Sequence, residues 1–129
     1  MAWKDEVRVA TTSNISITNP PSTIDGVSLS VGDRILVKDQ TNATENGIYV
    51  YNGSGNPLTR APDANSGSEL NAAVVTVAQG TANAGTAWRQ STPNPTLGTS
   101  DIVWVFFGTA VPDATGKIWL RVPGEQYPW

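Results

Sequence analysis

The sequence predicts an all-β protein, more specifically a compact antiparallel β-sandwich or β-barrel of about seven to nine short strands with a C-terminal extension. Two features of the sequence predict this class. Short runs in which apolar and polar residues alternate recur along the chain, and 12 Gly and 9 Pro residues separate them. No segment shows the apolar repeat of a long amphipathic helix. A chain of 129 residues is long enough for one domain with a substantial core.

The alternating runs predict about nine strands at the spacing that is typical of sandwiches and barrels. In chain order, these runs are residues 7–9, 15–18, 34–38, 47–52, 58–60, 73–78, 86–90, 102–107 and 117–122. The dipeptide Asp25-Gly26 favours a tight hairpin between residues 22–24 and 27–29. Residues 66–70 are expected to form one helical turn. The run at 102–107 is the most hydrophobic and has no polar face, which predicts burial on both sides.

The chain divides by composition into an all-β module at residues 1–107 and an extension at residues 108–129. Gly and Pro interrupt the extension around a single expected strand, and it ends in aromatic residues. Chain ends usually fray unless they are held by contacts. We therefore expect the extension to dock on the domain or on a neighbouring chain.

The composition excludes several classes of function. The chain has 8 basic and 11 acidic side chains, a net charge of −3, and its Arg and Lys residues form no cluster. This argues against nucleic acid as a partner. The absence of Cys and His removes thiolate sites, the commonest metal ligand and the Ser-His-Asp triad. No stretch is apolar enough for a membrane span or a signal peptide, so we expect synthesis without export and no membrane partner.

Carboxylates remain the only candidates for metal binding or catalysis. Asp63, Asn65 and Glu69 offer oxygen ligands at alternate spacing, but they do not fit the EF-hand pattern. The alternative is a capped turn in which these side chains bind local backbone N–H groups. Nothing in the sequence places two carboxylates together as a glycosidase requires. We therefore expect no metal, no cofactor and no enzymatic activity.

Aromatic residues are the most informative candidates for an interface or a ligand platform, because Trp and Tyr combine a flat apolar face with a polar group. In the expected strand at 47–52, Tyr49 and Tyr51 alternate with Ile48 and Val50. Ile48 and Val50 are expected to face the core. The two tyrosines lie either outside or against a second layer. The full candidate set is Trp3, Tyr49, Tyr51, Trp119, Arg121, Tyr127 and Trp129.

Several blocks of the sequence occur together in a recognisable order. The most specific are Ile24-Asp25-Gly26-Val27, Gly32-Asp33-Arg34, Glu45-Asn46-Gly47-Ile48-Tyr49 and Thr59-Arg60-Ala61. With them, residues 6–107 resemble a small all-β module of tail-fibre, baseplate and other virion-surface proteins of tailed bacteriophages. Relatives of this kind commonly carry a Trp before the Thr-Arg-Ala block, where this chain has Leu58. The extension after residue 108 lies outside the resemblance.

The resemblance implies a non-enzymatic virion structural protein that serves assembly or host-surface contact. Its expected partners are other virion proteins, further copies of itself (a trimer among the options) and host-surface glycan. Its expected location is the virion surface, after synthesis in the host cytoplasm. Two alternatives stay open, a capsid decoration (cement) protein and a carbohydrate-binding module.

Overall fold

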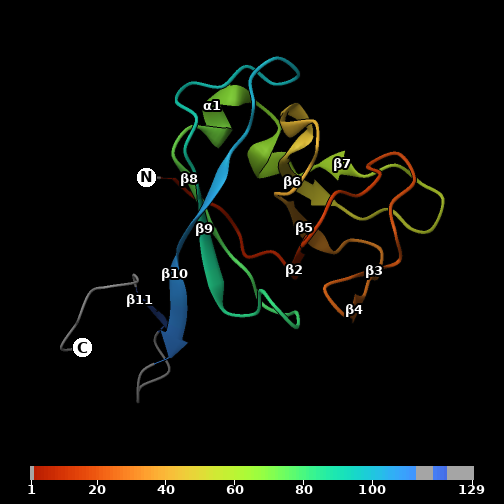
Figure 1. Cartoon of the computed structure of the whole chain (residues 1–129), viewed down its shortest axis with the longest axis horizontal. Helices are drawn as coiled ribbons and strands as arrows, with labels where there is room; N and C mark the ends of the chain where they lie inside the picture. Colours follow the sequence, from red (N-terminus) through yellow and green to blue (C-terminus); the bar gives the residue numbers. More distant parts are fainter. Residues whose placement is uncertain (1, 113–117, 122–129) are drawn as a thin grey trace.

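The computed structural model describes residues 2–112 and 118–121, and its elements are strands with three short helical turns (Figure 1). The all-β prediction is confirmed. The strands are β1 (Ala2–Trp3), β2 (Val9–Ala10), β3 (Thr23–Ile24), β4 (Val27–Ser28), β5 (Arg34–Val37), β6 (Gly47–Val50), β7 (Thr59–Arg60), β8 (Ala73–Thr76), β9 (Thr86–Gln90), β10 (Trp104–Pro112) and β11 (Ile118–Arg121). The helical turns are η1 (Ala43–Glu45), η2 (Pro62–Ala64) and α1 (Gly67–Leu70).

The strands form three sheets. One has the order β1-β8-β9-β10-β11, the second β2-β5-β6-β7, and the third is the hairpin β3-β4. None of these sheets closes into a barrel within the described residues. Most neighbouring strands are antiparallel, as expected, but β1 pairs with β8 and β2 with β5 in parallel. The prediction of a purely antiparallel fold is therefore wrong at these two pairs.

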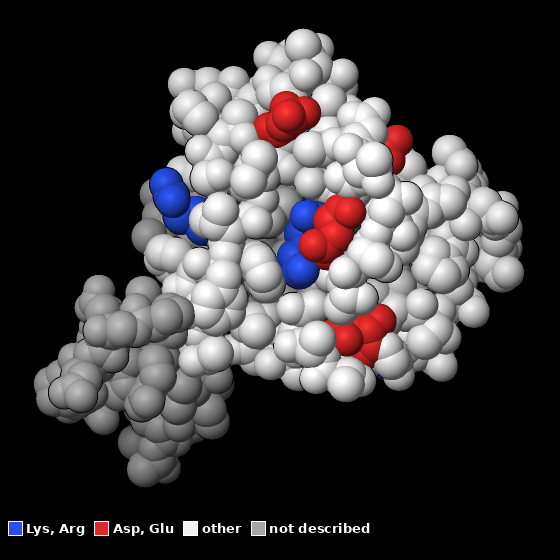
Figure 2. Space-filling model, viewed as in Figure 1, with Lys and Arg blue, Asp and Glu red and all other residues white. Residues whose placement is uncertain are grey.

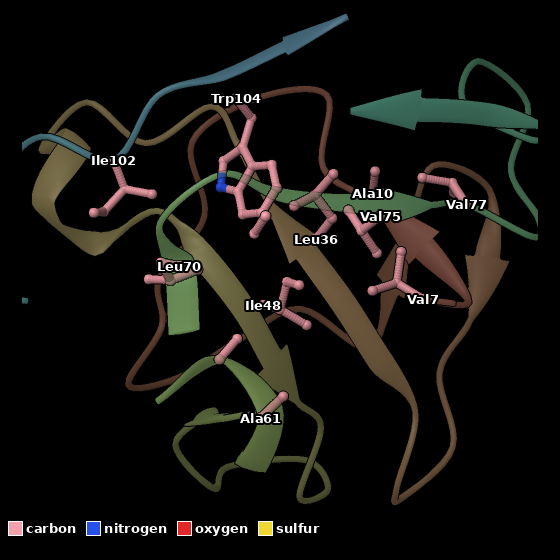
Figure 3. Packing of buried hydrophobic residues seen from close by; sticks show 12 residues of the cluster. Val7, Ala10, Leu36, Ile48, Ala61, Leu70, Val75, Val77, Ile102 and Trp104 are labelled. Atoms are coloured by element: carbon pink, nitrogen blue, oxygen red, sulfur yellow. The ribbon is translucent and has the colours of Figure 1, made fainter. Parts of the chain in front are cut away.

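The four-stranded sheet has an apolar cluster on each of its faces. The first core cluster joins it to the five-stranded sheet, and side chains of the two sheets, such as Leu36 and Ile48 against Val75 and Trp104, meet there (Figure 3). The second core cluster lies on the opposite face, where residues of β5 and β6 pack with Ile24 of the β3–β4 hairpin. Each fully buried aliphatic side chain contributes roughly 1.5–3 kcal/mol. The four-stranded sheet is thus the central layer of the domain.

The central position of β6 decides where its two tyrosines lie. Ile48 belongs to the first core cluster and Val50 packs against it, as predicted. Tyr49 and Tyr51 belong to the second core cluster, and each is only 3% exposed. The sequence allows the tyrosines to lie either outside or against a second layer, and in the structure they lie against a second layer. Neither tyrosine can serve as an exposed stacking platform, so this part of the candidate set is corrected.

Most predicted elements are present, and the differences lie at residues 15–18, at β1 and at β10. The hairpin is confirmed as β3 and β4, which meet through Asp25-Gly26, and the helical turn as α1 after Ser66. Residues 15–18 form no strand, although Ile15 and Ile17 pack against the second core cluster. Strand β1, which carries Trp3, was not predicted. Leu58 is 7% exposed and also lies in the second core cluster.

Strand β10 corrects the prediction for residues 102–107. Ile102 and Trp104 are buried in the first core cluster, but Val103 and Val105 are 41% and 38% exposed. This alternation means that only one side of the strand meets another layer. The run was expected to be buried on both sides because it lacks polar residues. Instead, the five-stranded sheet has an uncovered side at β10.

The strand is also longer than predicted. β10 continues through Gly108 to Pro112, with a shift of register between Phe106 and Gly108 where it pairs with β9. The expected boundary between module and extension, at residues 107/108, therefore falls within a continuous strand, at this irregularity.

Candidate functional site

The residues of the recognisable sequence blocks mainly hold loops in place. Arg60 donates hydrogen bonds to the carbonyl oxygens of Asn46 and Thr44, both at 3.1 Å. Its guanidinium lies over the ring of Tyr49. A Cβ at Gly47 would collide with Nη1 of Arg60, so the glycine makes room for the guanidinium. The blocks around residues 45–49 and 59–61 thus form one internal unit.

Tyr49 is part of this unit through its hydroxyl group, which donates to the carbonyl oxygen of Glu45 at 2.5 Å. Burial raises the pKa of Tyr49, an effect that the nearby Arg60 partly opposes and Glu45 reinforces. The hydroxyl is therefore a structural donor.

Asp25 links the β3–β4 hairpin to the loop before β9. Its carboxylate accepts hydrogen bonds from the backbone N–H groups of Ala82 and Asn83, with Oδ2 2.9 Å from the Asn83 nitrogen. Asp25 has a φ of +48°, in the left-handed region that Asp and Asn tolerate better than most residues. Its carboxylate also lies where a Cβ on Gly80 would stand. The Asp25-Gly26 turn is therefore fixed by contacts far along the chain.

Arg34 and Asp63 form a bidentate pair. The Nη1–Oδ1 distance is 3.0 Å and the Nη2–Oδ2 distance 3.1 Å, and Nη2 also donates to the carbonyl oxygen of Asp5. Burial alone would raise the pKa of Asp63, but hydrogen bonds from Arg34 and from the backbone N–H of Asp5 lower it below its usual value. The pair joins the N-terminal segment to β5 and η2, which is a structural task.

A cleft of about 270 Å³ lies beside this pair, lined by Glu6, Arg8, Asp33 and Arg34 among others. Nη1 of Arg8 is 2.6 Å from Oδ2 of Asp33, which also accepts from the backbone of Ser30. Basic and acidic side chains lie next to one another at the centre of the face seen in Figure 2. Both arginines of the cleft are thus held by aspartates, and the lining carries charges of both signs. This arrangement favours no particular charged ligand.

Asp63, Asn65 and Glu69, the residues considered as calcium ligands, instead form contacts that hold the local structure. Ser66 caps α1 by accepting from the backbone N–H of Glu69, and the Glu69 carboxylate accepts from Ser66 and from the backbone of Asn65. Ser66 is thus the side-chain cap of α1, and the Glu69 carboxylate turns back onto the Ser66 hydroxyl and the residue before it. Asp63 is engaged with Arg34. Within residues 2–112 and 118–121, no group of acidic side chains has the arrangement of a metal site.

The apolar surface at β1 and β10 is the feature that structural contacts do not explain. Trp3 is 54% exposed and Phe106 44% exposed, in addition to Val103 and Val105. The register places Trp3, Val74, Arg89 and Val105 in one row across β1, β8, β9 and β10. Directly paired residues share a face of a sheet, so this row lies on one face. We call it the outer face, because residues that alternate with its members belong to the first core cluster.

Phe106 lies on the other side of β10, opposite Trp88 in the register. The two rings meet edge to face, with centroids 5.6 Å apart and planes at 72°. The Nζ atom of Lys38 lies 4.4 Å from the Trp88 ring centroid. β10 therefore exposes apolar side chains on both sides of the sheet.

Beyond the body of the sheet, β10 continues as a two-stranded ribbon with β11. Thr109 is the last β10 residue that pairs with β9, whereas β11 pairs with β10 from Thr109 to Pro112. Figure 1 shows this hairpin extending away from the rest of the domain. A two-stranded ribbon alone is marginally stable in water. Here the ribbon is continuous with the five-stranded sheet through β10.

Two predicted site residues, Trp119 and Arg121, lie in this ribbon. Their backbones pair with Val111 and Thr109, respectively. Tyr127 and Trp129 lie outside the described residues. The structure thus places Trp3 and the exposed residues of β10 on the surface, and it places Tyr49 and Tyr51 in the core.

Sequence reasoning does not find the exposed positions of β10, because the apolar run predicts burial on both sides. The available signal was the strict alternation of strand side chains between two faces, which allows one face to stay open. In the part of the chain that the structure describes, no helix has the length and apolarity to cross a membrane. Searches of protein-family models, curated proteins and solved structures gave no match to this chain.

Proposed function

We propose that this chain is a non-enzymatic structural component of a tailed-bacteriophage virion, of the tail-fibre or baseplate kind. It would act through assembly with other virion proteins or through contact with the host surface. The sequence blocks that resemble virion-surface modules support this proposal. Most polar residues of these sequence blocks form hydrogen bonds that hold loops in place. A module that keeps such residues can retain its fold while the residues on its surface vary.

The observation that carries the proposal is the apolar character of β10 and its extension into the β10–β11 ribbon. Val105 and Phe106 of β10 are exposed on opposite sides of the sheet, Val103 just before the strand is exposed as well, and β10 runs past the end of its neighbour β9. Neighbouring exposed apolar side chains, such as Val103 and Val105 on the outer face, are a feature of surfaces that take part in protein association. In a protein that works by assembly, such a surface and such a ribbon would contact a partner protein.

The charged groups support a non-enzymatic role. Asp25, Asp33 and Asp63 bind backbone or arginine partners that fix loops. A general acid or base needs a carboxylate that can reach a substrate proton. These three carboxylates are instead used to hold the scaffold. We also propose that the two larger sheets pack as a β-sandwich across the first core cluster.

Host-surface contact includes glycan binding as one form. Sugar platforms rely on exposed aromatic faces, and the burial of Tyr49 and Tyr51 removes two of the candidates. The assembly form of the proposal, which uses the surface at β10, is therefore the better supported one.

Location on the particle tests the proposal. Purified virions of the phage that carries this gene are labelled with gold-conjugated antibody raised against the purified chain, with pre-immune serum as control. Label at the tail fibres or baseplate is the expected result. Label on capsid faces alone would overturn the tail assignment in favour of a decoration protein. Absence of the chain from washed particles, checked by mass spectrometry, would overturn a virion role altogether.

A further inference from the structure

We infer that Asn52 is a site of spontaneous covalent modification, at which the side-chain amide is lost and the residue becomes aspartate or isoaspartate. Asn52 lies in the loop between β6 and β7, and Gly53 follows it. Asn is among the chemically labile residues of proteins. The inference is independent of the proposed function, because it concerns a reaction of the chain with water alone.

The reaction begins when the backbone nitrogen of Gly53 attacks Cγ of Asn52. A bond forms between these two atoms, the Cγ–Nδ2 bond breaks, and the proton of the Gly53 N–H passes to Nδ2, which leaves as ammonia. Water then opens the resulting five-membered succinimide ring at one of its two carbonyl groups, which gives aspartate or isoaspartate. The reaction is favoured where the attacking N–H is free and the following residue has no side chain to obstruct ring closure. Glycine meets the second condition.

Gly53 also meets the first condition. Its N–H has no hydrogen-bond partner within residues 2–112 and 118–121, and residues 54–57 of the same loop are exposed. Nδ2 of Asn52 donates to the carbonyl oxygen of Pro57 at 2.9 Å and to Oγ1 of Thr59 at 3.1 Å. Both bonds lie at the exposed surface, where water can take the place of either partner. A local opening of this loop is therefore enough to release the amide for reaction.

The same dipeptide occurs at Asn46-Gly47, where the fold holds the amide in place. Nδ2 of Asn46 donates to the carbonyl oxygen of Ile102, and Oδ1 accepts from the backbone N–H of Gln40, each at 2.9 Å. Asn46 is only 4% exposed. The amide of Asn46 can react only after these buried contacts have opened.

The attacking N–H is also occupied at Gly47. The carbonyl oxygen of Ile48 accepts from the N–H of Ala61 on the β7 side of β6. Backbone groups of successive strand residues point to opposite sides, so those of Gly47 point toward β5, where Gly47 pairs with Val37. The two Asn-Gly dipeptides therefore share their local chemistry and differ in what the fold allows.

Conversion of Asn52 changes the contacts of its loop. An ionised carboxylate only accepts hydrogen bonds, so neither product can donate to Pro57 or Thr59 as the amide does. Leu58, which lies between these two residues, belongs to the second core cluster. The modification therefore removes two hydrogen bonds that fasten the loop beside this cluster.

The test follows both dipeptides in one sample of the full chain. Folded protein is kept in mildly alkaline buffer at physiological temperature, and aliquots taken over time are digested under mildly acidic conditions and analysed by mass spectrometry, which distinguishes an amide from a carboxylate at each position. Asn52 should lose its amide at least about tenfold faster than Asn46, because Asn46 reacts only after a local opening of the core. In concentrated guanidinium chloride the two residues should react at similar rates, since glycine follows both.

A variant identifies the modified residue independently. Asn52→Gln keeps an amide, but its longer side chain would have to close a six-membered ring, so it should lose no amide in the same period. Isoaspartate is detected by methylation with a protein isoaspartate methyltransferase. The folded wild-type chain should accept methyl groups, and Asn52→Gln should lose most of this labelling. Circular dichroism confirms that the variant is folded.

The inference is overturned if folded Asn52 keeps its amide for as long as the unfolded sample takes to convert. It is also overturned if Asn52 and Asn46 react equally fast in the folded chain, because the fold would then not select between them. Equal methylation of the wild type and Asn52→Gln would place the modification at another residue and would overturn the inference as well.

Discussion

The guanidinium group of Arg60 lies over the ring of Tyr49, with 5.0 Å between its carbon and the ring centroid. The same group donates to the carbonyl oxygens of Thr44 and Asn46. One side chain therefore covers the buried tyrosine and closes the loop that precedes β6. This contact joins two of the blocks through which the sequence resembles virion-surface modules.

Replacement of Arg60 tests the importance of this arrangement. Arg60→Met retains an apolar stem but loses both hydrogen bonds and the cation–π contact, and it should lower the free energy of unfolding by about 1–3 kcal/mol. Arg60→Lys keeps the charge but not the planar fork, so it should recover less than half of the loss. Urea unfolding followed by tryptophan fluorescence gives both values. Equal stability of all three proteins would contradict the role given to the guanidinium.

Asp63 should make the protein sensitive to acid. The pKa of Asp63 is lower in the folded state than the ordinary Asp value of 3.8. The ionised carboxylate therefore stabilises the folded protein at pH values above 3.8, and this stabilisation is lost as the pH falls through the folded-state pKa. Asp63→Asn should therefore lower stability at pH 7, by about 0.5–1.5 kcal/mol given the partial exposure of the pair. The difference between variant and wild type should shrink below pH of about 4.

Thermal unfolding measured between pH 7 and pH 2.5 checks this prediction. Asp101→Asn is the control, because Asp101 is exposed and forms no ion pair among the described residues. A difference between Asp63→Asn and wild type that persists unchanged to the lowest pH would count against the role of the carboxylate charge.

The sequence predicted the turns and most strands because their signals are local. Asp25-Gly26 joins β3 to β4, and residues 86–90 form a strand, as the turn chemistry and the alternation indicated. The sequence does not determine whether Tyr49 and Tyr51 are buried, for a physical reason. Alternation shows that the two tyrosines share a face, but whether that face is covered depends on a distant segment. Ile15 and Ile17 help to supply the cover as loop residues rather than as a strand.

The surface at β10 was missed for the opposite reason. The run at 102–107 is apolar on both faces, and apolar composition alone cannot show that one face has no layer above it. The exposed Val103 and Val105 are as apolar as the buried Ile102 and Trp104, and what separates the two pairs is the side of the strand to which they belong. That difference is set by the place of β10 in the five-stranded sheet, which involves strands far apart in sequence.

Asp25 offers a test of the long-range turn contact. Asp25→Ala removes the acceptor for the N–H groups of Ala82 and Asn83 and places alanine at positive φ, so stability should fall by about 1–3 kcal/mol. Asp25→Asn retains one oxygen and tolerates the left-handed conformation, so it should lose clearly less. Hydrogen exchange at Ala82 and Asn83 should accelerate in Asp25→Ala. Unaltered protection of both amides would show that other contacts hold the loop.

Asn46, the residue before β6, joins Gln40 to Ile102, which lies two residues before β10. Its Oδ1 accepts from the backbone N–H of Gln40, and its Nδ2 donates to the carbonyl oxygen of Ile102, each at 2.9 Å. Asn46 is 4% exposed. Asn46→Asp keeps the shape but sets a carboxylate oxygen against that carbonyl in a buried site, which should destabilise the fold by about 2–4 kcal/mol at pH 7. Protonation restores a donor, so part of the loss should be recovered in mild acid.

The matched control for this substitution is Asn56→Asp. Asn56 also donates through Nδ2 to a carbonyl oxygen, that of Asn52 at 2.9 Å, but it is exposed to solvent. Water can solvate the new carboxylate there, and the change should stay within about 0.5 kcal/mol. Chemical unfolding of both variants at pH 7 and pH 5 gives the comparison. Similar losses in the two variants would mean that burial does not set the penalty at Asn46.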